Sequence, residues 1–525
     1  DEEVFSDEDA RFLEGGISAE QAEAIDFVNQ QDDNNNEESI APTVIDATLV
    51  KRRITSTRKA LNKNEKQRAR FSDDPSRFME SEAELDAEVR QLDFLSEAAH
   101  LYPVALEAGL AELCAELLGH ENTDIACAAV EVLNSCLDEN VQHSEKEMEQ
   151  LLKGLDAANV LPALVQNLAR LDEQVAHEQQ AYYDTLLILE NICNLDNTFK
   201  RKLAEATRIV NVLVARIQQK DVKSALDIAQ NKQYAAELLS LIVSDTASPN
   251  IALQCIRMQG VEAMLLCLAP YRKKQPVKMS FDEEFLENCF DVLCRLVSLP
   301  TGKDDFLEQE GVGLMERLMT DPKAAKQAKR RALEVLDFAC GSWQGGAVCA
   351  AVVQAGLLKH LFATFMKKPE QSVLRNLLGL FASFFRTLNP GEPERIRVLN
   401  KFGEKQYAKL IQLVGVHVQL FARRQEVQAK IVQAEAARPA TMSAVERREY
   451  DLVNLLSLMD EGGLDALQLC DITLAWLSAE DAEMSKFILA ELTKASLTPA
   501  SVIQTVREMS TGLEDVVKEA ISEGD

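Results

Sequence analysis

The stretch Gly109-Leu110-Ala111-Glu112-Leu113 shows the pattern that decides the fold, a small or turn-forming residue followed by an apolar V/L-x-x-L helix start. The same kind of junction recurs at intervals of 50, 49, 52, 51 and 45 residues. The junctions are Gly109-Leu110, Asn159-Val160, Arg208-Ile209, Gly260-Val261, Gly311-Val312 and Gly356-Leu357. Apolar residues recur at three and four residues from about residue 80 onward, which is typical of helices rather than strands. The chain is therefore an array of helical units.

The period is slightly longer than the roughly 40–47 residues of armadillo and HEAT units, and it fits them better than other repeats. It predicts an all-α fold, an armadillo/HEAT-like right-handed α-solenoid in which stacked units build one core. Ser248-Pro249 and Asp321-Pro322 read as an N-cap followed by proline at the first helical position. After residue 400 the period is lost. Helices expected over 402–430, 446–460 and 464–478, with another after Thr498-Pro499, predict a C-terminal helical cap.

Charge divides the chain further. The whole sequence has 56 basic and 85 acidic residues and a net charge of −29. Residues 1–45 contribute −13 and are expected to be a disordered acidic tail, with a short helix open over Ala19–Val28. Residues 46–77 contribute +6 and form a predicted basic helical lead-in. Residues 78–400 are the predicted repeats, acidic chiefly before residue 206, and 401–525 are the predicted cap. This acidity disfavours nucleic acid and membranes as partners.

The basic stretch has two interpretations. Lys51-Arg52-Arg53 fits a nuclear-import signal or a nucleic-acid contact. Alternatively, 46–77 is a helix that lies against the acidic repeats following it, since opposite charges adjacent in sequence often pair. We favour the second interpretation.

Chemistry for catalysis is absent from the sequence. No GxxxxGK[ST], GxGxxG, GxSxG or HExxH motif occurs, and no two of the six histidines have metal-ligand spacing. His120 is expected to hydrogen-bond a turn between helices. The eleven cysteines lie in apolar helical patterns without a CxxC pair, so we interpret them as buried, reduced side chains. No stretch approaches the length of a membrane span. The sequence predicts no enzyme, cofactor or metal site.

The last helix of each unit carries an acid at a matched position. Four units read Glu131-Val132-Leu133-Asn134, Glu237-Leu238-Leu239-Ser240, Asp291-Val292-Leu293-Cys294 and Glu334-Val335-Leu336-Asp337. The second unit departs, with Ile188-Leu189-Glu190-Asn191. The apolar pairs would pack inward, and because residues at i and i+3 share a helix face, the polar residues would line a groove. The candidate contacts for a Lys/Arg-rich peptide are Glu131, Asn134, Glu190, Asn191, Glu237, Asp291, Glu334 and Asp337, with Asn134 and Asn191 as backbone clamps. The alternative is that these acids only solvate a helical surface.

Several strings resemble landmarks of the beta-catenin-like protein 1 family, which is armadillo-type and splicing-associated. They occur in order over residues 46–480. The strings are Pro75–Glu82, Leu117–Asp124, Leu164–Glu173, Glu310-Gly311, Val335–Asp337, Phe365–Pro369 and Leu399–Phe402. The charged insert expected after Phe365–Pro369 is shortened here to Glu370-Gln371-Ser372, and the linker after Lys430 is short. Partners that use those regions are therefore in doubt.

The resemblance implies a nuclear scaffold of pre-mRNA splicing, associated with the NineTeen complex of the spliceosome. It implies partners with basic, nuclear-localisation-like segments, including the Myb-domain splicing factor of that complex, and in some members a cytidine deaminase. The alternative is a nuclear-transport adaptor resembling importin alpha, for which residues 51–70 would have to bind a transport receptor. The Trp-x-x-x-Asn pairs of importin alpha are missing, since the only tryptophans are Trp343 and Trp476. A homo-oligomer surface in the C-terminal cap is left open.

Overall fold

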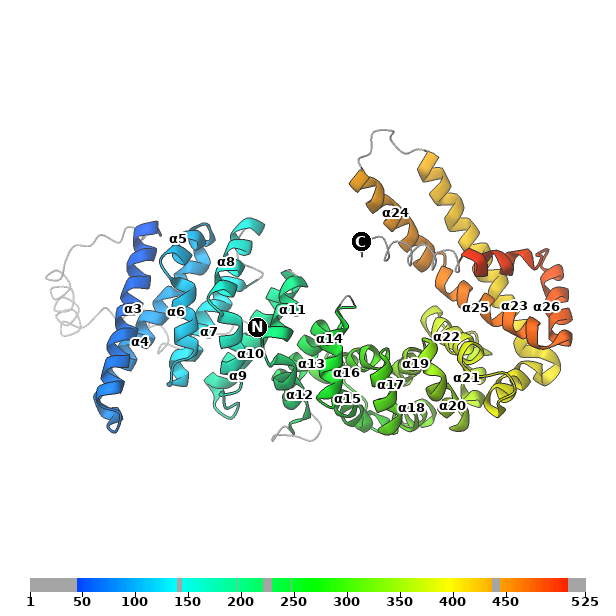
Figure 1. Ribbon diagram of the computed structural model, residues 1–525, viewed down its shortest axis with the longest axis horizontal. Coiled ribbons are helices and arrows are strands. Elements are labelled where there is room, and N and C mark those ends of the chain that lie inside the picture. The colour runs from blue at the N-terminus through cyan, green and yellow to red at the C-terminus, as the bar shows by residue number, and fades with distance from the viewer. Residues whose placement is uncertain are drawn as a thin grey trace, which may run out of the picture.

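The computed structural model describes residues 45–138, 144–195, 197–220, 229–246, 248–436 and 444–508. Within these ranges all regular structure is helical, and the helices form a long curved row that bends back at its C-terminal end (Figure 1). This confirms the all-α solenoid. Most of the predicted tail, including the short helix expected over Ala19–Val28, lies outside the described residues.

The described repeats consist of three-helix units. The first helices are α5 (Tyr102–Glu107), α8 (Glu145–Ala157), α11 (Asn197–Ala206), α14 (Pro249–Arg257), α17 (Pro300–Glu308) and α20 (Gly346–Gln354). The second helices are α6 (Leu110–Leu118), α9 (Val160–Leu168), α12 (Ile209–Gln218), α15 (Gly260–Leu268), α18 (Gly311–Thr320) and α21 (Leu358–Phe365). The third helices are α7 (Thr123–Leu137), α10 (Ala176–Leu195), α13 (Gln230–Val243), α16 (Phe281–Val297), α19 (Lys326–Cys340) and α22 (Gln371–Thr387). Each third helix packs against the third helix of the next unit, so these six helices form one continuous surface.

The repeated junctions of the sequence mark the starts of the second helices. Most are preceded by a residue with left-handed backbone, at Gly109, Asn159, Gln259, Glu310 and Gly356. This conformation turns the chain sharply from the first helix to the second, and glycine adopts it most easily. Two predicted junction glycines, Gly260 and Gly311, come one residue after the turn. A Cβ at Gly260 would lie 2.7 Å from the carbonyl oxygen of Cys255, so glycine is needed there for close packing.

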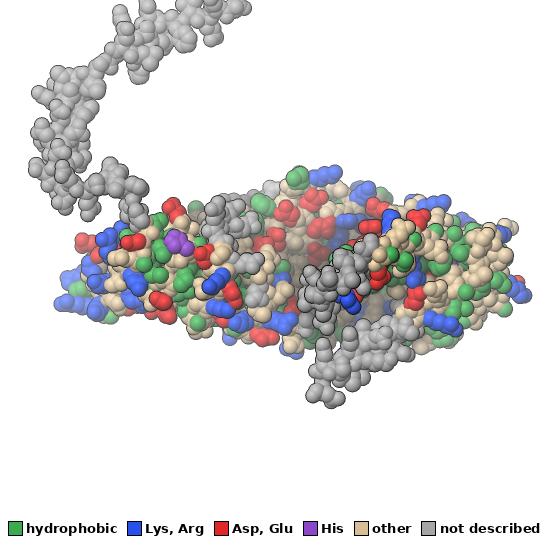
Figure 2. Space-filling model, turned by 90° about the horizontal axis from the view of Figure 1, so that it is seen from above, with side chains coloured by type: hydrophobic (Ala, Val, Ile, Leu, Met, Phe, Trp, Pro, Cys, Tyr) green, Lys and Arg blue, Asp and Glu red, His purple; other side chains and the backbone are tan. Residues whose placement is uncertain are grey.

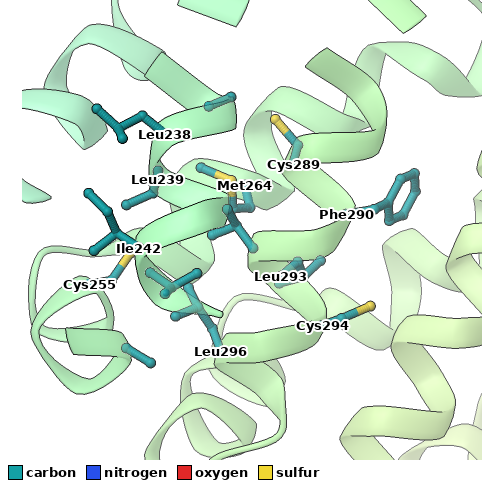
Figure 3. Packing of buried hydrophobic residues seen from close by; sticks show 14 of the residues in the cluster. Leu238, Leu239, Ile242, Cys255, Met264, Cys289, Phe290, Leu293, Cys294 and Leu296 are labelled. Atoms are coloured by element: carbon teal, nitrogen blue, oxygen red, sulfur yellow. The ribbon is translucent and has the colours of Figure 1, made fainter. Parts of the chain in front are cut away.

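The core is continuous along the array because each unit buries its apolar face against the next. Figure 3 shows one such region, where side chains of α13, α14, α15 and α16 interdigitate. Its labelled members are Leu238, Leu239, Ile242, Cys255, Met264, Cys289, Phe290, Leu293, Cys294 and Leu296. All eleven cysteines are free thiols, and all except the partly exposed Cys267 are buried, as the sequence predicted.

The predicted lead-in corresponds to α3 (Ala47–Arg70) and a short 3-10 turn over Pro75–Arg77. Helix α3 packs against α4 (Met79–Arg90) at the N-terminal end of the array (Figure 1). Arg58 pairs with Glu116 of α6 at 3.0 Å, Lys63 pairs with Glu84 of α4, and Arg68 pairs with Glu82 and Glu121. The basic helix therefore lies against the acidic repeats, as we favoured, although Lys51 and Arg52 stay exposed.

The C-terminal region contains α23 (Pro393–Ala436), α24 (Ala444–Asp460), α25 (Leu464–Glu480) and α26 (Ala482–Lys494), followed by helical residues 500–508. Helix α23 runs across the boundary that we expected near residue 400, with a break in its helical backbone at Glu404–Tyr407. Helix α25 packs against both α22 and α23, so the region closes the end of the core.

One predicted helix start is wrong. Asp321-Pro322 does not open a helix, because Asp321 follows the end of α18 and its side chain accepts a hydrogen bond from the Lys323 amide at 2.9 Å. This turn delays the start of α19 to Lys326. Ser248-Pro249 does precede α14, with the proline at its first position.

No single helix in the described ranges is long and apolar enough to cross a membrane, although two sharply bent helix pairs, α14 with α15 and α20 with α21, meet that test together.

Candidate functional site

The matched acids of the third helices lie on consecutive elements of one surface. Glu131 is on α7, Glu190 on α10, Glu237 on α13, Asp291 on α16 and Glu334 on α19. Glu131 and Asp291 are exposed, and the other three are half-buried. Figure 2 shows acidic side chains gathered along the hollowed middle of the molecule. We call the surface formed by α7, α10, α13, α16 and α19 the acidic groove.

At the N-terminal end of the acidic groove, Glu131 forms an ion pair with Arg90 of α4. Asp184 of α10 lies nearby and is buried. Burial raises the pKa of Asp184 even though Gln180 donates a hydrogen bond to its carboxylate at 2.8 Å, and the charge of Glu131 raises it further. Arg90 therefore neutralises part of the charge of Glu131, and the raised pKa of Asp184 favours its uncharged form, so this end of the groove carries less negative charge than its number of acids suggests.

The centre of the acidic groove is formed by α10 and α13. The Tyr183 and Tyr234 rings pack edge to face with centroids 4.8 Å apart, and their hydroxyls are hydrogen-bonded to each other at 3.3 Å. The hydrogen bond with Tyr183 and burial raise the pKa of Tyr234, and the charges of Glu237 and Glu190 raise it further. Glu237 also accepts a hydrogen bond from Gln233 at 2.7 Å. Two acids and two partly exposed tyrosines thus share one part of the groove.

Toward the C-terminal half, one arginine holds several of the acids. Arg331 of α19 pairs with Glu287 at 3.1 Å, with Glu334 at 2.8 Å and with Asp291. Arg331 is buried, and its guanidinium lies over the Phe290 ring. Because three carboxylates share one buried cation and the more exposed Arg330, this part of the groove keeps only part of its negative charge.

Asp337 differs from the other candidates because it is buried, with only 7% of its surface exposed. It pairs with Arg375 of α22, which also contacts Asp465 of α25 at 3.1 Å. Burial raises the pKa of Asp337 to about 7 although the Arg375 charge lowers it. In this arrangement Asp337 joins α19 to α22 and α25 and is not accessible to a peptide.

The two candidate clamps are placed differently from each other. Asn191 donates a hydrogen bond from its side-chain nitrogen to the Leu137 carbonyl at 3.2 Å, so it already ties α10 to α7. The side-chain oxygen of Asn134 is buried and has no hydrogen-bond partner among the described atoms. Because this oxygen is buried, a peptide could reach it only after the Asn134 side chain turns outward.

Sequence reasoning missed four residues of this surface, namely Tyr183, Tyr234, Arg331 and Arg375. The tyrosines are 51 residues apart, close to the repeat period, so an alignment of the third helices could have found them. Arg331 lies three residues before Glu334 on the same helix, a spacing that favours pairing. Arg375 has no comparable signal.

Of the two tryptophans, Trp343 is 78% exposed and Trp476 lies under the Arg395 guanidinium.

A chain of side chains in the C-terminal region has the connectivity of a hydrolase triad. The His417 ring nitrogens lie 2.5 Å from Asp471 Oδ1 and 3.1 Å from Ser501 Oγ. All three residues are buried, and the Ser501 hydroxyl donates to the Thr498 carbonyl at 2.9 Å, so its proton is not offered to His417. The cluster ties helix 500–508 to α23 and α25. It is a structural contact.

No other candidate for catalysis stands out in the part of the chain that the structure describes. No group of three metal-ligating side chains occurs there. His120 contacts Asn64 at 3.0 Å and accepts from the Asn122 amide at 3.1 Å, as expected for a residue of a turn. Burial lowers its pKa.

This chain is similar to several known proteins. Residues 22–507 match the family described as catenin-beta-like, arm-motif containing, nuclear. The beta-catenin-like protein 1 homolog of Schizosaccharomyces pombe is 30% identical over 514 residues, which cover 98% of this chain and 86% of the relative. Beta-catenin-like protein 1 of Rattus norvegicus is 30% identical over 397 residues, 74% of this chain and 68% of the relative. Among solved structures, an engineered protein aligns over 88% of this chain and 98% of its own, with a TM-score of 0.49 and 15% identity.

Proposed function

The chain belongs to the catenin-beta-like family of arm-motif nuclear proteins, and from this premise we propose that it is a non-catalytic protein-binding scaffold of pre-mRNA splicing in the nucleus. Its ligands would be Lys/Arg-rich, nuclear-localisation-like segments of partner proteins, such as the Myb-domain splicing factor of the NineTeen complex. The observation that carries the proposal is the stacking of α7, α10, α13, α16 and α19, which brings acids from five units onto one surface.

The best place for such a segment is the centre of the acidic groove. Glu190 and Glu237 lie there beside the Tyr183–Tyr234 pair. Partly exposed tyrosines can pack against the aliphatic stems of lysine and arginine or interact with their charges. Asn134, on the adjacent α7, would contribute its carbonyl oxygen after its side chain turns toward the peptide, since this oxygen is now buried.

The transport-adaptor alternative receives less support. It needs residues 51–70 for a receptor, yet Arg58, Lys63 and Arg68 pair with acids of the first repeats. A transport receptor would have to break these pairs or use the other exposed bases of the stretch, which are Lys51, Arg52, Lys59, Lys66 and Arg70.

The proposal is tested by titrating a fluorescein-labelled Lys/Arg-rich peptide and following anisotropy. The variant is Glu237→Lys/Asp291→Lys, and the matched control is Glu112→Lys/Glu308→Lys, which makes the same charge change at exposed positions on α6 and α17. We expect the groove variant to lose affinity about tenfold or more, equivalent to at least about 1.4 kcal/mol. The control should bind like the wild type, and wild-type affinity should fall as salt rises. Equal affinities for the two variants, or an affinity insensitive to salt, would overturn the proposal.

A further inference from the structure

Helix α24 presents an apolar face that no described element covers. Leu452, Leu455, Leu456 and Met459 are 56%, 48%, 51% and 39% exposed. Their spacing of i, i+3, i+4 and i+7 puts them on one side of the helix. The principal packing partners of α24 are α23 and α25, with which it forms an arm projecting from the end of the array (Figure 1). A surface of this kind is the normal sign of a binding site.

A segment of the same chain has the matching pattern. Residues 509–525 follow the last described residue, and their apolar members include Leu513, Val516, Val517, Ala520 and Ile521. This i, i+3, i+4, i+7, i+8 spacing predicts an amphipathic helix.

The structure fixes where this segment begins. Ser501 is held by His417, and Glu508 pairs with Arg424 of α23 at 2.6 Å. The neighbouring Arg423 donates to the carbonyl of Asp460, the last residue of α24, at 3.4 Å. Adjacent arginines of α23 therefore hold the end of helix 500–508 and the end of α24, so both ends lie near the same part of α23.

The register follows from this starting point. We take Glu508 to be level with Asp460, and because two antiparallel helices have the same rise per residue, this choice sets the later neighbours. Met509 would then lie beside Met459, Leu513 beside Leu455, and Val516 beside Leu452. This alignment satisfies the apolar pattern of both helices.

We propose that residues 509–525 dock in cis as a helix antiparallel to α24 and cover its apolar face. This inference is independent of the acidic groove. It makes α24 a regulated surface, because a partner that binds there has to displace the segment.

Hydrogen exchange of the full chain tests the docking. The variant Leu513→Asp/Val517→Asp is compared with Thr511→Asp/Ser522→Asp, which adds the same charge to the opposite face of the predicted helix. We expect the amides of residues 452–459 to exchange at least about tenfold faster in the first variant and at the wild-type rate in the second. Equal exchange in all three proteins overturns the proposal.

A pair of introduced cysteines tests which segment covers the apolar face of α24. In a Cys267→Ser background, where the remaining native cysteines are buried, Leu455→Cys with Leu513→Cys should oxidise to a disulfide within one chain, at a rate independent of protein concentration. The control pair, Leu455→Cys with Asp515→Cys, should oxidise much more slowly because residue 515 faces away. A disulfide between chains would assign the face to a second copy and overturn docking in cis, as would equal rates for the two pairs.

Discussion

The guanidinium of Arg331 on α19 pairs with the carboxylate of Asp291 on α16, and the same buried side chain also holds Glu287 and Glu334. The acidic groove therefore contains its own counter-ion between two repeats. A cation in this position both lowers the net charge of the groove and connects neighbouring units.

Replacing this cation should destabilise the protein. Arg331→Met leaves three carboxylates close together without their partner, and removing one member of a buried ionic network typically costs about 3–5 kcal/mol. We expect a loss of about 3 kcal/mol in the free energy of unfolding, measured by urea titration with circular dichroism. Arg330→Met, at an exposed residue whose single pair with Glu287 is 3.4 Å long, should cost less than about 1 kcal/mol. Similar losses for the two variants would contradict the assigned role.

Asp337 should make stability depend on pH. Its pKa is about 7 in the folded protein because of burial, against about 3.9 for an unfolded aspartate. Between these values the folded state keeps a proton that the unfolded state has released, so stability falls as pH rises from about 4 to about 7. Asp337→Asn removes this contribution, and its Tm should decline less than that of the wild type between pH 5 and pH 7. Asp304→Asn, at an exposed carboxylate, serves as the control and should parallel the wild type. A parallel curve for Asp337→Asn as well would show that the site does not bind the proton.

Two glycines of α18 allow a matched comparison. A Cβ at Gly311 would overlap the ring of Phe306, which is fully buried and cannot move aside, whereas a Cβ at Gly313 would meet nothing within 4 Å. We expect Gly311→Ala to lower the free energy of unfolding by about 1–3 kcal/mol, as overpacking usually does. Gly313→Ala should raise it by about 0.5–1 kcal/mol, because alanine favours the helix. Thermal unfolding compares them directly, and a loss in both variants would mean that helix propensity and packing are not separated here.

The repeat architecture could be predicted from the sequence because the residues that mark each unit lie next to one another in the chain. The turn before most of the second helices needs a left-handed residue or a close approach, and Gly109, Gly260 and Gly311 meet these needs. Asp321-Pro322 misled because the same two residues also suit a turn, and the choice was made by the Asp321 side chain and the Lys323 amide.

The candidate site was only partly predictable for a different reason. The positions of Glu131, Glu237 and Asp291 follow from the repeat period, so their common surface could be inferred. The burial of Asp337 could not, because it depends on Arg375, 38 residues later, and on Gly379, where a side chain would overlap the Asp337 carboxylate. Contacts between repeats decide which acids remain available, and no single repeat encodes them.

A buried lysine provides a last test of how the repeats are joined. Lys303 is almost completely buried, and its ammonium group donates to the carbonyls of Val297 at 3.0 Å and of Phe338 and Ala339 at 2.9 Å. Since the last carbonyls of α16 and α19 have no partner within their own helices, this one side chain caps both. Lys303→Met should cost about 3 kcal/mol in the free energy of unfolding, because it leaves several buried acceptors unsatisfied. It should also speed hydrogen exchange in residues 338–345, next to the exposed Trp343. The exposed Lys326→Met should change neither quantity, and unaltered exchange in Lys303→Met would show that the carbonyls do not depend on the lysine.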